Sequence, residues 1–332
     1  MTAAIPPVAL VPVLLDKPWG GDALARWGLP VAPGARIGEA WMFADIAETS
    51  TGGAGGGAFH SPIANGPART YSLRDAAHDW PGGLTGAGAA AEHPLLVKLL
   101  HAKEHLSVQV HPSPAYAAAH PGAKLKAESW YVLYAEPGAE LFLGLMPGTT
   151  AADAVALAGE GRIADVLRRV PAVAGECHTL PSGLVHAMGA GVVIAEVQTA
   201  SDTTFRLYDW AKEYRRAPRT LHLSEALGAM LPEAEARTVR AAVPAAGVRE
   251  HRQVVADTAQ YRLEQRYCAP GVATAVPPGA IVLAISGFGV MGDVAVTPSQ
   301  AVFARGGASL MTPSNRSLTW LEATLADATF AS

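Results

Sequence analysis

The stretch Gly175–His186, GECHTLPSGLVH, combines a short strand, a turn and a histidine. Pro181-Ser182-Gly183 has the composition of a tight turn, and the strand that follows it begins at His186. The side chain of His186 then points into the interior of a β-barrel, where a neutral imidazole is able to bind a divalent metal. The stretch therefore predicts a β-barrel with a candidate metal ligand at His186.

The spacing of this stretch, G-x5-P-x-G-x2-H, resembles the second signature motif of cupin barrels. Upstream, the segment LSVQVHPS places Gln109 and His111 two residues apart. Side chains at this spacing on a strand share one face, while Val108 and Val110 occupy the other. A solvent-facing polar pair on an amphipathic strand is the alternative. The apolar neighbours and the preceding apolar run PLLVKLL favour the buried interpretation.

A candidate carboxylate ligand, Glu128, opens a run of large residues in the segment LKAESWYVL. A lone glutamate before a strand is more often an exposed edge residue. Glu128 is therefore a candidate ligand only in combination with the histidines and the glutamine. One glutamine, two histidines and one glutamate form an N/O set that suits zinc or a similar first-row ion. Such a set needs no cysteine and is typical of an open catalytic site. The predicted metal ligands are Gln109, His111, Glu128 and His186.

A buried cation is the notable feature of the segment AEVQTASDTTFRLYDW, where Arg206 lies among aromatic residues. A guanidinium in apolar surroundings is costly unless an anion or a carboxylate meets it. From this segment alone, a structural salt bridge to Asp202 or Asp209 is the favoured explanation. An anion-binding role for Arg206 is the alternative.

Bulk composition excludes several classes of protein. The 332 residues are 50% hydrophobic and 16% charged, which supports a substantial core and excludes disorder by composition. The net charge of −4 argues against a nucleic-acid binder. No uninterrupted apolar run reaches the roughly 20 residues that a membrane helix needs. Two cysteines are too few for a disulfide scaffold, so we expect a soluble protein in a reducing, cytoplasmic compartment.

Short apolar runs separated by 34 glycines and 25 prolines predict many strands joined by tight turns. The expected strands are Pro94–Leu100, Leu106–His111, Ser129–Tyr134, Glu140–Gly144, Cys177–Leu180, Val192–Gln198 and Ile281–Ser286. Helical periodicity is confined to Ser72–Trp80, Thr150–Arg169 and Ser224–Leu231, with Ser72 and Ser224 as capping residues. The sequence predicts a mainly β fold with a few short helices.

Three parts of the chain are expected. Residues 1–232 form a catalytic β-barrel domain with small helical segments. Residues 233–254, rich in Ala, Pro and Arg, lack strand alternation and form a linker. Residues 255–332 return to strand-and-turn texture and form a second, cupin-like β domain. Of eleven histidines only His251 follows residue 222, so metal chemistry is expected in the first domain alone.

Six runs, in this order, resemble the type I mannose-6-phosphate isomerases in their shorter bacterial form. They are KPWGG, IGEAW, PLLVKLLHAKEHLSVQVHPS, LKAESWYVL, LPSGLVHAMGAG and SDTTFRLYDW, and they extend over most of residues 10–225. The resemblance implies tandem cupin (double-stranded β-helix, or jelly-roll) barrels and one zinc ion per chain. It also implies reversible interconversion of mannose 6-phosphate and fructose 6-phosphate, so the expected partner is a small-molecule sugar phosphate. Oligomeric state is not expected to be readable from the chain.

The resemblance also carries roles to individual residues. Gln109, His111, Glu128 and His186 match the metal-binding positions, and Arg206 matches an active-site arginine. Ser107, Lys98 and Lys126 fall on motif positions near the substrate. Departures from the family pattern, such as Leu125 and Ala127 beside Lys126, bear on the sugar preference and leave the ligand positions intact.

The reaction that these residues imply is aldose–ketose isomerisation through a cis-enediol. Arg206 is expected to stabilise negative charge near the metal, and Lys98 or Lys126 with Ser107 to hold the phosphate. The base that moves the carbon proton is not readable from the sequence, and Lys126 is the first candidate. The alternatives are an isomerase of a different, unphosphorylated sugar and a non-catalytic sugar-binding or regulatory bicupin.

Overall fold

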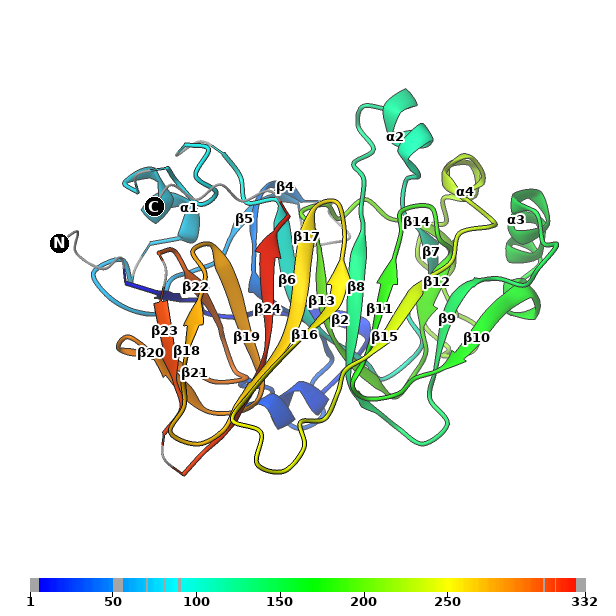
Figure 1. Cartoon of the computed structure of the whole chain (residues 1–332). Helices are drawn as coiled ribbons and strands as arrows, with labels where there is room; N and C mark the ends of the chain where they lie inside the picture. Colours follow the sequence, from blue (N-terminus) through cyan, green and yellow to red (C-terminus); the bar gives the residue numbers. More distant parts are fainter. Residues whose placement is uncertain are drawn as a thin grey trace.

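The computed structural model of the chain describes residues 6–49, 56–69, 71–80, 82–88, 91–306, 308–313 and 315–326. Antiparallel sheets stacked face to face dominate these residues, and short helices lie at the periphery (Figure 1). The expectation of a mainly β fold with a few short helices is confirmed. Among the described residues, no helix has the length and apolar character needed to cross a membrane.

Two sheets form the first barrel. The seven-stranded sheet has the order β15-β11-β8-β13-β6-β3-β2. Its strands are Arg237–Arg240, Glu176–Leu180, Glu128–Ala135, Val192–Thr199, Leu95–Ala102, Ile37–Phe43 and Val13–Gly21. The five-stranded sheet has the order β10-β9-β12-β7-β14. Its strands are Leu167–Pro171, Glu140–Leu145, His186–Met188, Val108–Val110 and Phe205–Tyr208. Leu143, Trp130 and Ile194 belong to the core cluster of this barrel.

Two further sheets form the second barrel. The six-stranded sheet has the order β1-β22-β19-β24-β17-β16. Its strands are Val8–Ala9, Ala301–Ala304, Ala280–Gly287, Leu318–Leu325, Tyr261–Cys268 and Glu250–Asp257. The four-stranded sheet has the order β18-β23-β20-β21. Its strands are Ala273–Val276, Ala308–Met311, Gly289–Met291 and Val294–Val296. A separate hairpin pairs β4 (Asp45–Thr49) with β5 (Gly57–His60).

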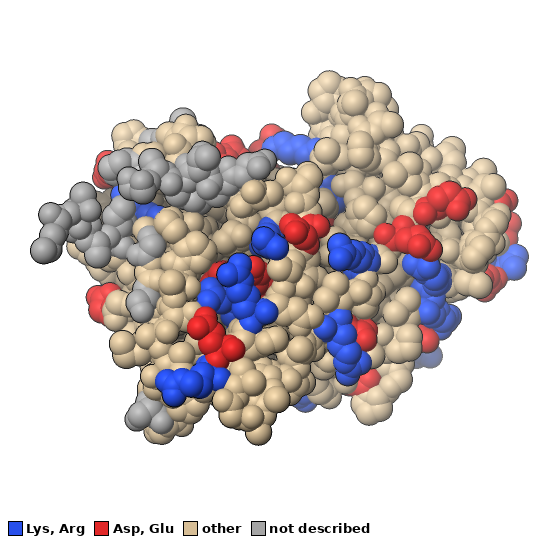
Figure 2. All heavy atoms as spheres, in the orientation of Figure 1, with Lys and Arg blue, Asp and Glu red and all other residues tan. Residues whose placement is uncertain are grey.

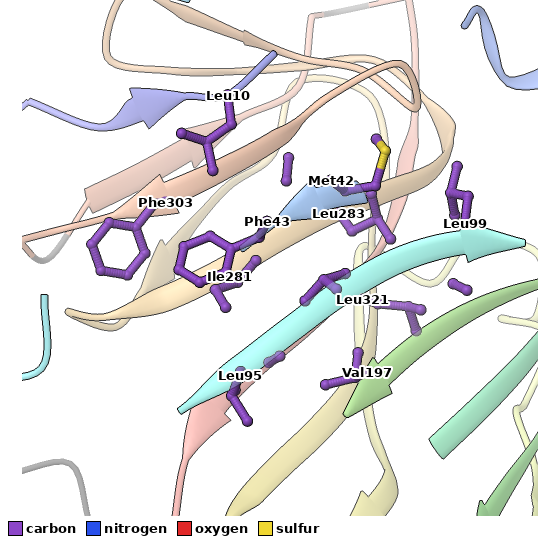
Figure 3. Packing of buried hydrophobic residues seen from close by; sticks show 14 of the residues in the cluster. Leu10, Met42, Phe43, Leu95, Leu99, Val197, Ile281, Leu283, Phe303 and Leu321 are labelled. Atoms are coloured by element: carbon purple, nitrogen blue, oxygen red, sulfur yellow. The ribbon is translucent and has the colours of Figure 1, made fainter. Parts of the chain in front are cut away.

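The two barrels share a hydrophobic interface between the seven-stranded and six-stranded sheets. Figure 3 shows the side chains that meet there, among them Leu95, Leu99, Val197, Ile281, Leu283 and Leu321. These side chains are buried, and full burial of a Leu or Phe contributes about 1.5–3 kcal/mol each. A large apolar interface of this kind holds two domains in a fixed relation. The arrangement is that of tandem cupin barrels packed back to back.

The helices follow from local sequence signals. α1 (Leu73–His78) begins after Ser72, the predicted capping residue, which also forms a capping box with Asp75. α3 (Ala151–Gly159) ends earlier than the periodicity predicts, since Gly161 has a positive φ of 76° and a short 3-10 turn (Ile163–Val166) and β10 follow. α3 and α4 (Leu223–Ala229) contribute Ala154 and Ala226 to a core with residues of the five-stranded sheet.

Other local expectations need correction. α4 begins after His222, so Ser224 lies inside the helix and is not its cap. α2 (Pro114–Ala119), capped by Ser113, is a helix that the periodicity did not indicate. All seven strands expected from the sequence are present, with ends shifted by one or two residues. Most shifts are explained by pairing, because a neighbouring strand extends or shortens the hydrogen-bonded ladder.

Pairing also modifies the expected division of the chain. The segment 233–254, expected as a linker, contains β15, which pairs with β11 of the first barrel. Its residues Arg237–Arg240 are mostly exposed and lack an apolar face, so only the pairing partner makes them a strand. At the other end of the chain, β1 pairs with β22 of the second barrel. β16 (Glu250–Asp257), which pairs with β17 of the second barrel, begins inside the same segment and crosses the expected boundary at 255, while the boundary at 232 stays a prediction.

Candidate metal centre

Three side chains from separate strands converge inside the first barrel. His111 follows β7, Glu128 begins β8 and His186 begins β12. One ligand atom from each lies within 4.8 Å of the others, and all three residues are buried. His186 Nε2 lies 3.1 Å from Glu128 Oε1, and His111 Nε2 lies 3.5 Å from Glu128 Oε2. These distances suit three donors around one divalent ion.

The turn before His186 has the geometry that its sequence predicts. Gly183 has a φ of 93°, and a Cβ at this position would lie 2.8 Å from Leu231 Cγ, so a glycine is required. The Gly183 N–H also donates to the His111 carbonyl at 2.9 Å. The turn therefore ties the two histidine-bearing segments together and fixes their separation.

Both histidines are oriented to present Nε2. His111 Nδ1 lies 2.8 Å from the Thr203 carbonyl, and His186 Nδ1 lies 2.9 Å from the Leu184 carbonyl. Since a carbonyl only accepts, each Nδ1 carries a proton, and each ring turns its Nε2 toward Glu128. Burial, with the nearby Lys126 ammonium as the second cause, lowers the pKa of His111 to about 3. The imidazole is therefore neutral at pH 7, as a metal ligand requires.

A cation already lies against this ligand set. Lys126 Nζ lies 2.7 Å from Glu128 Oε2 and 3.1 Å from His111 Nε2. Burial alone would raise the pKa of Glu128, but Lys126, His111 and His186 together outweigh burial and hold the pKa well below its usual range. A buried carboxylate needs a positive group beside it, which Lys126 supplies here, and one carboxylate with two imidazole nitrogens is a donor set that a divalent metal takes. The residues present thus fit a divalent metal.

Gln109 lies beside the three. Its Nε2 is 3.2 Å from His186 Nε2, and its Oε1 is 3.5 Å from Ser107 Oγ. The assignment of the amide nitrogen and oxygen is interchangeable, and the reversed amide turns its oxygen toward His186 Nε2. Gln109 therefore stays a predicted fourth ligand, and Ser107 orients it.

A cavity of about 910 Å³ adjoins the centre, since its lining includes Gln109 and Lys126, which contact His186 and His111. All five of the remaining side chains predicted near the site, namely Lys98, Ser107, Gln109, Lys126 and Arg206, line this cavity. Arg206 donates from Nη1 to the Thr220 carbonyl at 2.7 Å, and its buried Nε has no hydrogen-bond partner among the described residues. Asp209, one of the two carboxylates expected to pair with Arg206, instead accepts hydrogen bonds from Arg216 and Arg219.

Several cavity residues were not singled out from the sequence. Four of these residues lie in the KPWGG and IGEAW runs, namely Lys17, Trp19, Glu39 and Trp41. Three others line the same cavity but lie elsewhere in the chain, namely Glu196, Arg219 and His222. The family-like runs KPWGG and IGEAW could have drawn attention to the residues that they contain. The charge pairs that such residues form between distant strands cannot be read from the sequence. Lys98 Nζ lies 3.5 Å from Glu39 Oε2 and 3.4 Å from Glu196 Oε2. Lys17 Nζ lies 3.4 Å from Glu39 Oε1.

These pairs form a compensated cluster at one end of the cavity. Indole groups complete it, because Trp41 Nε1 donates to Glu39 at 2.8 Å and Trp130 Nε1 donates to Glu196 at 3.0 Å. Burial alone would raise the pKa of Glu39, yet Lys98 and Lys17 outweigh it and lower the pKa to about 2. Carboxylates beside aromatic rings are suited to sugar hydroxyl groups, which need acceptors and an apolar face.

The ionisation of Glu39 predicts a pH dependence of stability. Its folded-state pKa of about 2 lies below the ordinary value of 4.5, so the ionised form favours folding. This contribution is complete above about pH 4.5 and is lost as the pH falls toward 2. We expect Glu39→Gln to lower the Tm at neutral pH and to flatten the fall in Tm over that range, measured by calorimetry. Equal slopes for wild type and Glu39→Gln would contradict this; exposed Glu48→Gln is the control.

The fold and the site define a tandem cupin with a candidate divalent-metal centre in its first barrel. No family model matches the chain. It is 35% identical over 223 residues to mannose-6-phosphate isomerase ManA of Bacillus subtilis, covering 67% of each chain. It is 34% identical over 223 residues to mannose-6-phosphate isomerase of Streptococcus mutans, covering 67% of this chain and 66% of that one. The chain belongs to the mannose-6-phosphate isomerase family.

Solved structures extend the likeness in fold to nearly the whole chain. The mannose 6-phosphate isomerase from Bacillus subtilis superposes with a TM-score of 0.70 at 24% identity, covering 96% of this chain and 100% of that chain. The enzyme from Salmonella typhimurium, bound to fructose 6-phosphate and zinc, superposes with a TM-score of 0.66 at 16% identity, covering 96% and 99%. The second barrel, where sequence resemblance was only textural, therefore shares the family fold.

Proposed function

We propose that the protein is a zinc-dependent isomerase that interconverts mannose 6-phosphate and fructose 6-phosphate through a cis-enediol. The convergence of His111, Glu128 and His186 beside a cavity that Gln109 and Lys126 line carries the proposal. Family membership supplies the substrate class, since its relatives are mannose-6-phosphate isomerases and one neighbour was solved with fructose 6-phosphate and zinc. His111, Glu128, His186 and Gln109 would hold one zinc ion per chain. Bound zinc supplies Lewis-acid stabilisation of negative charge on a sugar oxygen.

The chain's own residues supply proton transfer and charge stabilisation. Lys126 lies at the centre with its Nζ against Glu128 and His111, so it is the proposed group that moves the proton between C1 and C2. Arg206 is paired with Gln109 across β14 and β7, which places it beside the ligand set. Its guanidinium is the proposed stabiliser of the negative charge that develops on the substrate.

Charge favours one end of the cavity for the phosphate. Lys98, an expected phosphate contact, lies between Glu39 and Glu196, so its charge is already compensated. At the other end Arg206 and Arg219 lie close enough that, after burial, Arg219 is the largest cause lowering the pKa of Arg206 to about 10. Two guanidinium groups that repel each other are stabilised by a dianion between them. Among the described residues, Arg206, Arg216 and Arg219 meet only Asp209 and Glu104, whereas Lys17 and Lys98 are matched by Glu39 and Glu196. The arginine cluster therefore keeps a positive charge, and we propose that the phosphate binds there, at Arg219, in preference to Lys98, while Arg206 meets the charge that develops in the reaction.

The surroundings of the enzyme follow from the same proposal. Its partner is a small sugar phosphate, and we place it in the cytoplasm because Cys177 and Cys268 are both buried, free thiols. On the face drawn in Figure 2, among the described residues, positive and negative side chains lie next to one another without a large patch of one sign. This mixture is typical of a surface that binds no polyanion.

A coupled assay tests the proposal directly. We expect fructose 6-phosphate to form from mannose 6-phosphate, and no ketose to form from unphosphorylated mannose. Dialysis against EDTA is expected to abolish turnover and zinc to restore it. Turnover that survives complete metal removal would refute the metal-dependent mechanism. Comparable turnover of mannose would instead point to a different sugar, and binding without turnover to a regulatory bicupin.

A further inference from the structure

A tyrosine of the second barrel contacts the strand that carries a proposed metal ligand in the first. Tyr261, the first residue of β17, is fully buried in the interface between the two barrels. Its hydroxyl donates to the Val197 carbonyl at 3.0 Å and lies 2.8 Å from Ser129 Oγ. Since the phenol proton goes to Val197, the serine hydroxyl donates to the phenol oxygen. One side chain of the second barrel thus binds two strands of the first.

Both partners lie directly behind the metal centre. Ser129 follows Glu128 in β8 and pairs with Val197 of β13, while Glu128 itself pairs with Gln198. Alternation along each strand places Ser129 and Val197 on the side of the second barrel and Glu128 on the side of the cavity. Figure 3 shows Val197 in this interface. The phenol therefore holds the back of the sheet at the residue next to Glu128.

The position of Glu128 makes this contact consequential. Glu128 is the first residue of β8, and a strand end is held by fewer ladder hydrogen bonds than its middle. Ser129 Oγ also lies 3.4 Å from Thr179 Oγ1 of β11, so the group at Tyr261 joins three adjacent strands, β11, β8 and β13. A fixed strand end limits the movement of the carboxylate that projects from it.

We propose that Tyr261 is a positioning residue for the metal centre: the second barrel, through this phenol, fixes the start of β8 and with it the Glu128 carboxylate. The inference rests on the proposed function in one respect, namely that Glu128 binds zinc. It gives the second barrel a role in the chemistry of the first, because a first barrel alone would lack the group that holds this strand end from behind.

The interface provides a matched control. Tyr131 lies on the same strand two residues after Ser129, is buried in the same hydrophobic cluster, and accepts a hydrogen bond from Gln265 Nε2 at 3.3 Å. Tyr131→Phe therefore deletes a buried interfacial hydroxyl that belongs to β8. Tyr261→Phe deletes a buried interfacial hydroxyl of the second barrel that bonds to β8. The two variants differ in whether the lost hydroxyl bonds the residue next to Glu128.

The experiment measures the zinc affinity of the full-length apo-protein by competition with a chromophoric chelator, without reference to turnover. We expect Tyr261→Phe to raise the Kd for zinc severalfold, below the about tenfold minimum for removing a group bonded directly to a metal ligand, because the phenol bonds the residue next to Glu128 and not Glu128 itself. Tyr131→Phe is expected to leave the Kd unchanged. Ser129→Ala is expected to weaken zinc as Tyr261→Phe does, and the double variant to be no weaker than either single one.

Two results would overturn the inference. One is an unchanged Kd in both Tyr261→Phe and Ser129→Ala; the other is an equal loss in Tyr131→Phe, which would indicate general loosening of the interface. Should Tyr261→Phe fail to fold, Ser129→Ala against Tyr131→Phe decides alone. Failure of the proposed function looks different, because wild-type protein would then bind no zinc or would not isomerise mannose 6-phosphate.

Discussion

Replacing His186 by alanine is expected to remove bound zinc and isomerase activity together. The change deletes one of three convergent donors and leaves the buried Glu128 carboxylate 3.1 Å from the lost nitrogen without that partner. Loss of a direct ligand should exceed the about 10-fold to 100-fold loss of affinity that follows removal of a group bonded to a ligand. Metal content by elemental analysis and turnover in the coupled assay measure the two effects.

His178 provides the control for this variant. It lies in the same stretch of chain, is fully buried, and contacts Thr238 Oγ1 through Nδ1 at 2.9 Å outside the ligand cluster. Burial lowers its pKa to about 4, so it too is a neutral imidazole. We expect His178→Ala to lose thermal stability and to keep zinc. A His186→Ala protein that retained stoichiometric zinc would show that the ion binds elsewhere.

Replacing Arg206 by alanine is expected to lower kcat about 10²-fold to 10³-fold while the protein keeps its zinc. Arg206 pairs with Gln109 on the neighbouring strand, and none of its hydrogen bonds among the described residues reaches His111, Glu128 or His186. Its removal should therefore cost charge stabilisation and spare the ligand set. Steady-state kinetics on mannose 6-phosphate, with metal analysis of the same preparation, checks both parts.

Arg219→Ala separates the two roles assigned to this end of the cavity. Arg219 is held by Asp209 and lies further along the chain from the ligand set, so its loss should raise KM for the sugar phosphate more than it lowers kcat. An exposed arginine outside the cavity, Arg162, serves as the control, and Arg162→Ala should change neither constant. Loss of zinc in Arg206→Ala would mean that Arg206 supports the metal and not the substrate.

Local sequence signals predicted most of the first barrel. The turn at Pro181–Gly183, the two-residue spacing of Gln109 and His111, and the helix cap at Ser72 are each fixed within a few residues, and the structure has all three. The predictions failed where contacts with neighbouring strands determine whether an element forms or where it ends. β15 exists because β11 offers it a partner, and α3 is shorter than its apolar periodicity because Gly161 and the following β10 end it.

In the metal centre and the cavity, too, local signals were readable from the sequence and long-range contacts were not. Histidines and a glutamate in a recognisable spacing predicted the convergence at the centre of the cavity. Nothing in the sequence near Lys98 indicated that Glu39 and Glu196, each far from it along the chain, would compensate its charge. Charge pairing across strands depends on sheet order and register, and these are tertiary properties. A phosphate-binding part of the cavity could therefore be proposed only once the order and register of the strands were known.

The pairing of β1 with β22 has a consequence for synthesis on the ribosome. Val8 and Ala9 leave the ribosome long before their partners Phe303 and Val302. The Leu10 N–H donates to the Ala301 carbonyl at 3.0 Å, so it also gains its partner only after that later segment has been made. The strands of the first barrel all precede residue 241, whereas the six-stranded sheet of the second barrel is completed only after β22 and β24 have been made. Changes to β1 should therefore disturb the second barrel before the first.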